Sequence, residues 1–118
     1  RTTVENVLKS LAAQEASGAS TFDLTGANSA VKTDNPGVTF VADPDDATFN
    51  AHAPGSGGDP KKVYVLGDGT ADVSVCVTSK STRAYAARVV AGQGVTARGS
   101  STTNCGAALS GGTGFNQS

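Results

Sequence analysis

The feature that most constrains this fold is the order of its sequence patterns: an amphipathic helix comes first, β-strand patterns follow, and two cysteines come late. Between residues 3 and 16 the apolar side chains recur at helical spacing. They form one stripe, which comprises Val4, Val7, Leu8, Leu11 and Ala12. A lone helix of this length is marginal in water, so its stripe must pack on another element. We expect the strands that follow to provide that surface.

Four segments have the Val, Thr, Tyr and Phe enrichment of β-strands. They span residues 38–42, 62–66, 73–79 and 83–91. A fifth, shorter strand is predicted at 94–98. Gly67–Thr70 and Lys80–Thr82 are short enough for hairpin turns, and the sequence offers no second long helix. The pattern predicts one α+β domain, 1–118, in which the N-terminal helix packs on an antiparallel β-meander of about four strands.

The remaining segments carry loop and turn signals. Residues 17–37 are predicted to be a connecting loop, with one short helical turn over Leu24, Ala27 and Val31. Within the sheet region, 38–98, residues 43–60 are acidic at their start and rich in Gly and Pro at their end, which is typical of a surface loop. Residues 99–118 show no periodicity, and we expect a disulfide to hold them.

The strand predicted at 73–79 also determines where its cysteine points. Val73, Val75 and Val77 share one face, and Ser74, Cys76 and Thr78 share the other. The valine face should receive the helix stripe. Cys76 should then point away from the helix, and a disulfide from it would hold the C-terminal region across the outer face of the sheet.

Two cysteines allow a single intramolecular pairing, Cys76 with Cys105. The apolar residues are mostly Ala and Val, so the core is modest and a covalent link would help. Closing the loop 77–104 would stabilise the fold by about 3–4 kcal/mol. Two unpaired buried thiols are the alternative. The polar surroundings of Cys105 favour the disulfide, and with it an oxidising, extracellular location.

Charge and hydropathy argue against two classes of partner. The net charge of −1 gives no long-range attraction to nucleic acid or to an anionic membrane. The basic residues are scattered, and some could pair with acidic groups on a neighbouring copy; they include Lys61, Lys62, Lys80, Arg83, Arg88 and Arg98. The sequence contains neither a bilayer-spanning stretch nor a signal peptide, so export would require a targeting segment that has been removed.

No catalytic constellation is present, and we expect neither an enzyme nor a cofactor. The only histidine, His52, lies in a Gly- and Pro-rich segment and is interpreted as a solvated loop residue. Asp43, Asp45 and Asp46 are weak candidates for a metal site because they lack the EF-hand spacing. The alternative is a solvated turn in which Asp46 caps a short helical turn. Asn116–Ser118 is a formal glycosylation sequon.

The helix at 3–16, the block Val73–Ser79 with its cysteine, the strand Tyr85–Val90 and the late Cys105 together resemble the soluble head of a type IV pilin or pseudopilin. The likeness is closest to pilins of high-GC Gram-positive bacteria, and the Ala-, Gly- and Val-rich composition agrees with such a genome. In layout the resemblance covers nearly the whole chain. The prepilin cleavage site and apolar helix of the family would lie upstream of Arg1.

The resemblance implies a structural subunit that assembles with copies of itself into a helical filament for adhesion, motility or DNA uptake. The upstream apolar segment would anchor the subunit in the membrane before assembly. Loops 43–60 and 99–118 would contact neighbouring subunits. Two alternatives stay open. One is a pseudopilin of a type II secretion or competence system, and the other is a secreted ligand- or carbohydrate-binding β domain that would use Phe49, Tyr64 or Tyr85.

Overall fold

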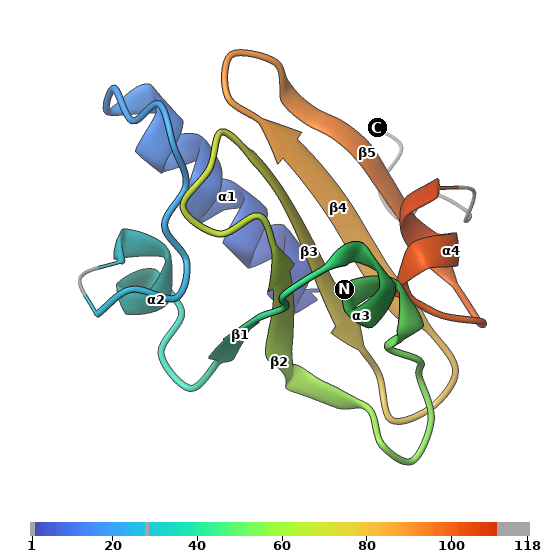
Figure 1. Cartoon of the computed structure of the whole chain (residues 1–118). Helices are drawn as coiled ribbons and strands as arrows, with labels where there is room; N and C mark the ends of the chain where they lie inside the picture. Colours follow the sequence, from blue (N-terminus) through green and yellow to red (C-terminus); the bar gives the residue numbers. More distant parts are fainter. Residues whose placement is uncertain (1, 28, 111–118) are drawn as a thin grey trace.

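A long N-terminal helix, α1 (Thr2–Ala16), crosses one face of a five-stranded sheet, and two short helices, α3 (Asp46–Ala51) and α4 (Cys105–Ser110), lie over the opposite face (Figure 1). Another short helix, α2 (Ala30–Asp34), packs beside α1. The computed structural model describes residues 2–27 and 29–110. The predicted α+β class, with its N-terminal helix on a mostly antiparallel sheet, is confirmed.

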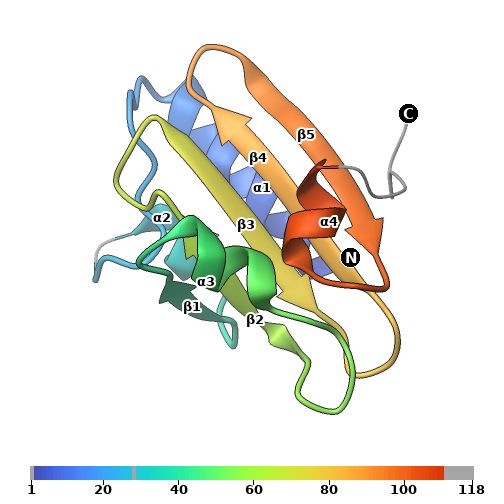
Figure 2. The same ribbon diagram turned by 45° about the vertical axis from the view of Figure 1, so that its right-hand side comes forward.

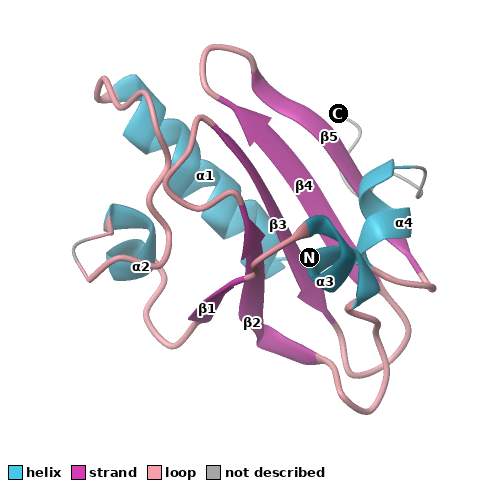
Figure 3. Ribbon diagram, viewed as in Figure 1, coloured by secondary structure: helices cyan, strands magenta, loops and turns pink. Residues whose placement is uncertain are grey.

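The strands follow one another across the sheet in chain order (Figure 3). They are β1 (Thr39–Ala42), β2 (Asp59–Leu66), β3 (Asp72–Thr78), β4 (Ala84–Val90) and β5 (Gly94–Ser101). Strands β2 to β5 form the predicted antiparallel meander, but β1 pairs with β2 in parallel. The expectation of a wholly antiparallel sheet is therefore wrong at this edge. The chain leaves β1, passes through α3 and returns to the end from which β1 started, so the two strands run in the same direction.

The stripe on α1 packs on the sheet as predicted. Val4, Val7 and Leu11 are fully buried and Leu8 is nearly so, whereas Ala12 is exposed and lies outside the stripe. Each buried Val or Leu side chain contributes about 1.5–3 kcal/mol relative to an exposed one. The sheet side of this core includes Val63, Val65, Val73, Val75, Val77 and Val89.

The register predicted for β3 is confirmed. Val73, Val75 and Val77 belong to the core under α1, whereas Cys76 belongs to a second, smaller core on the outer face of the sheet. Cys76 is bonded to Cys105 at the start of α4. The second core also contains Phe49, Ala84, Ala86 and Ala108. The disulfide thus fastens the C-terminal region to the face opposite α1.

The prediction of a surface loop at 43–60 is wrong in two places. Its middle part forms α3 and buries Phe49 completely, and its last two residues, Asp59 and Pro60, belong to β2. The cap of this helix is Asp45, and not Asp46 as expected, because the Asp45 carboxylate accepts a hydrogen bond from the Thr48 amide at 2.8 Å. Phe49 follows on the inner face of the helix. It fills the space above the disulfide.

Two other predicted loops contain regular structure. In 17–37, Ser29 caps α2, which contains Val31 but neither Leu24 nor Ala27. In 99–118, β5 continues to Ser101 and α4 follows. The predicted sequon at 116–118 lies outside the described residues.

Candidate functional site

Helices α3 and α4 lie side by side over the outer face of the sheet (Figure 2). Residues of both helices line a groove with a volume of about 970 Å³. Asp46 and Asn50 line it on the α3 side, and Ala107 and Leu109 on the α4 side. Three strands contribute residues to its floor. These residues are Leu66 at the end of β2, Ser74 near the start of β3 and Arg88 near the end of β4. Since these residues come from separate segments of the chain, no single sequence pattern marks the groove.

The two helices that form its walls are held in place by three contacts. The disulfide joins α4 to β3, and the Cys105 amide donates a hydrogen bond to the His52 carbonyl oxygen at the end of α3, at 2.8 Å. Gly106 then meets Asn50 so closely that no larger residue would fit without movement. Sequence reasoning found the cysteines and missed the other contacts, which arise only when the two helices meet.

The groove is acidic. Its lining includes five aspartates, which are Asp43, Asp45, Asp46, Asp68 and Asp72. The Asp68 carboxylate accepts hydrogen bonds from the Leu24 amide and from the amide and hydroxyl of Thr25. Among the lining residues Arg88 is the one cation, and it is paired: its Nε donates to Asp72 Oδ1 at 2.8 Å, with a second contact between Nη2 and Oδ2. The lining is therefore acidic, although Asp43, Asp45, Asp68 and Asp72 all have partners within the chain.

Two of these carboxyls have shifted pKa values. The hydrogen bond from Arg88 lowers the pKa of Asp72, and the same bond raises the pKa of Arg88. The backbone hydrogen bond from Thr48 lowers the pKa of Asp45. Both shifts favour the ionised form of the carboxyl. Asp46 is exposed and also lines the groove.

Ser74 lies at the floor of the groove, on the outer face of β3. The residue as a whole is only 6 % exposed, and its hydroxyl is not among the buried side-chain atoms that lack a hydrogen-bond partner in the described part of the chain.

His52 is packed, and the interpretation of it as a solvated loop residue is wrong. Its ring stacks on Tyr64, with centroids 3.4 Å apart and planes 12° apart, and its Nε2 lies 3.1 Å from Asp43 Oδ2. The Asp43 side chain is 4 % exposed. Because α3 ends at Ala51, the capping residue His52 turns its ring onto β2. The cluster fastens α3 to the sheet.

The three aspartates considered as a metal site have separate partners. Asp43 faces His52, Asp45 caps α3, and Asp46 is exposed. Within residues 2–27 and 29–110, no three His, Cys, Asp or Glu side chains come together in a way that could hold a metal ion. The acidic residues of the groove thus lie apart from one another and do not form one cluster.

The outward face of α1 is a second surface of interest. Ala12, Ala13 and Ala16 are exposed there, close to Lys9 and Asn6. The side chains are small at its C-terminal end, whereas the longer Lys9 and Asn6 side chains lie before them. In the described part of the chain, no helix has the length and apolarity needed to cross a bilayer.

The fold and its disulfide define an α+β domain with one long helix on one face and a disulfide-linked helix on the other. Comparisons with protein-family models, with curated proteins and with solved structures each give no significant match. Function must therefore be argued from the surfaces of this domain.

Proposed function

We propose that this domain is the head of a filament subunit of the type IV pilin class. The observation that carries the proposal is the division of α1 into two faces. One face is buried on the sheet through Val4, Val7, Leu8 and Leu11, and the other exposes small alanines. Small residues allow a second helix to approach closely. A helix with one face on its own head and a patch of small residues facing outward is suited to close contact with a neighbouring helix in a filament.

The disulfide supports an extracytoplasmic location. Disulfides persist in oxidising compartments, and Cys76–Cys105 joins two elements that are both buried in the second core. The link also leaves α1 unobstructed, because it lies on the opposite face of the sheet. In the proposal an apolar helical segment ahead of Thr2 anchors the subunit in the membrane and later lies in the filament core.

The rival reading of a carbohydrate-binding domain has less support. Such sites stack sugars on accessible aromatic rings, and each of the three candidate rings is engaged. Phe49 is fully buried, the ring of Tyr64 is stacked under His52, and Tyr85 packs against the core under α1.

The decisive experiment is to determine the encoded sequence upstream of Arg1 and to image cells that express the intact gene. The proposal expects an apolar run of about 20 residues leading into α1, and surface filaments that disappear when the gene is deleted. A cleavable signal peptide directly ahead of α1, together with a secreted monomer, would contradict it.

A further inference from the structure

The strand at one margin of the sheet, β1, leaves part of its backbone unpaired. Its neighbour in the sheet is β2, with which it pairs in parallel, and the Asp43 amide donates to the Val65 carbonyl oxygen at 2.7 Å. The backbone groups of successive strand residues point to alternate sides, so those of Val41 also face β2, whereas those of Phe40 and Ala42 face away from it. Among the described residues, none forms a hydrogen bond with these outward N–H and C=O groups.

The side chains of β1 form an apolar margin beside these open groups. Phe40 packs against the core under α1 but is only half-buried, and Val41, on the other face, is half-buried as well. The strand contains no charged residue, and Pro44 follows it closely. An added strand would cover what remains exposed of both side chains.

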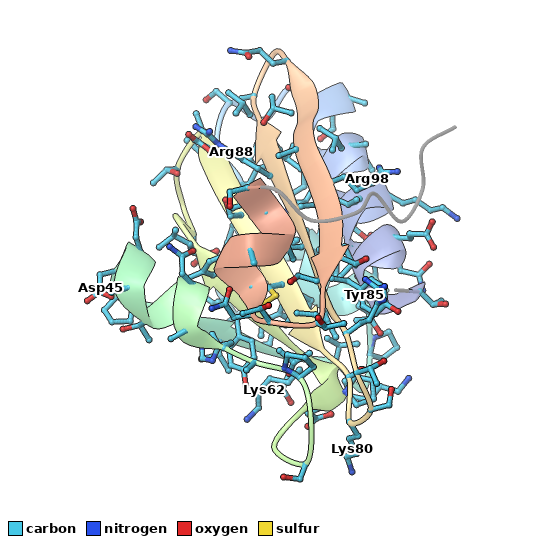
Figure 4. The ribbon with its side chains drawn as sticks, turned by 90° about the vertical axis from the view of Figure 1, so that its right-hand side faces the viewer. Asp45, Lys62, Lys80, Tyr85, Arg88 and Arg98 are labelled. Carbon is cyan, nitrogen blue, oxygen red and sulfur yellow. A yellow bond between two sulfur atoms is a disulfide. The ribbon has the colours of Figure 1, made fainter. Side chains whose placement is uncertain are left out.

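The opposite edge of the sheet is protected. On β5, Arg98 pairs with Ala87 of the core under α1, so its side chain lies on that side of the sheet (Figure 4). Arg98 and Ser100 both have partners within the chain. A charged side chain on an edge strand is one of the usual means of preventing the edge from pairing with another chain. Of the two edges, β1 is therefore the one available for pairing.

We propose that β1 pairs with β1 of a second copy, antiparallel about a two-fold axis at Val41, and so joins two sheets into one. In this register the outward groups of Phe40 face those of Ala42 in the second copy, so each outward N–H meets an outward C=O. On the face under α1 the large Phe40 ring lies opposite the small Ala42 side chain, and on the other face Val41 lies opposite its own counterpart. The strand is thus complementary to itself, which favours a second copy over other extended partners.

The pair is a closed dimer, because a two-fold contact uses the same surface of both copies. It stands apart from the proposed function, since it joins heads of opposite direction, whereas subunits repeated along one filament share a direction. Because β1 has only four residues, we expect a weak contact, with a dissociation constant on the order of 100 μM.

Charge variants at position 41 test the register, because this position meets itself across the two-fold axis. Val41→Lys and Val41→Glu should each stay monomeric through like-charge repulsion, whereas an equimolar mixture should associate about tenfold more tightly than either variant alone. Sedimentation velocity over a concentration series measures the association, and melting temperatures show that the variants fold. Gln93→Lys and Gln93→Glu, at an exposed position in the turn between β4 and β5, are the matched controls and should dimerise like wild type.

Ala42→Pro tests the backbone pairing without a charge. It removes an N–H that faces away from β2, which an edge strand tolerates, so the melting temperature should be nearly unchanged while dimerisation weakens about tenfold. In NMR spectra of the wild-type chain, the amide signals of Phe40 and Ala42 should shift with protein concentration.

Four outcomes would overturn the inference. They are a wild-type chain that stays monomeric, an equimolar mixture that associates no more tightly than the single variants, concentration-dependent shifts centred on β5, and an unrelated extended peptide that shifts the Phe40 and Ala42 amides as strongly as a second copy does. The last result would show that the edge accepts extended chains in general.

Discussion

Gly106 and Asn50 are in such close contact that a β-carbon at position 106 would stand 2.7 Å from the Asn50 β-carbon. This approach sets the distance between α3 and α4, and hence the width of the groove. Both helices are anchored beneath it, by Phe49 and by Cys105, so neither can easily move aside. The glycine is required by space, because its backbone φ is an ordinary one.

The first prediction follows from this contact. Gly106→Ala should destabilise the fold by about 1–3 kcal/mol, because the added methyl group must push the two anchored helices apart. Urea unfolding measures the change. Gly57→Ala is the matched control, since a β-carbon there meets nothing within 4 Å. Equal stability of the two variants would show that α3 and α4 are free to separate.

The second prediction concerns the disulfide. Reduction should lower the free energy of unfolding by about 3–4 kcal/mol, because the loop between Cys76 and Cys105 is no longer closed in the unfolded chain. The outer core around Phe49 should loosen first, since both cysteines belong to it, whereas the core under α1 contains neither. Hydrogen exchange with and without reductant would show this order. Simultaneous loss of protection in α1 and α4 would contradict it.

The sequence was sufficient to predict those parts of the fold that have long periodic signals. The stripe on α1 and the alternation of Val73, Val75 and Val77 specify which faces meet, and the position of Cys76 in that alternation specifies the face that carries the disulfide. Successive side chains of a strand point to opposite faces of the sheet. Once the residues on the buried face are identified, the residues on the other face are identified as well.

The missed elements are those whose signals are short or nonlocal. Helices α3 and α4 each have six residues, too few for a helical period to be recognised. Their capping residues were visible in the sequence: Asp45 and Asn104 each accept a hydrogen bond from the amide three residues later. The parallel pairing of β1 follows from the path of the chain through α3 and has no local signal.

The third prediction concerns pH. Arg88 lowers the folded-state pKa of Asp72, so the pair stabilises the protein above the unfolded pKa, near 3.9, and that stability is lost as pH falls through the lower folded value. Both side chains are about half exposed, so solvent screens the pair and its contribution to stability should be small. Arg88→Gln should raise the Asp72 pKa towards its usual value in an NMR titration. An unchanged pKa would mean that the pair does not form in solution.

The fourth prediction tests the outward face of α1 in the intact gene product. Ala12→Arg should leave the head folded, with a stability change within about 0.5 kcal/mol, because position 12 is exposed and Arg is a good helix former. It should nevertheless reduce the number of filaments, because a long charged side chain would replace the small one of Ala12 in the patch that it forms with Ala13 and Ala16. Ala30→Arg, at an exposed alanine on α2, is the matched control and should assemble normally. Electron microscopy of expressing cells counts the filaments. Wild-type abundance for Ala12→Arg would remove the alanine patch of α1 from the assembly surface.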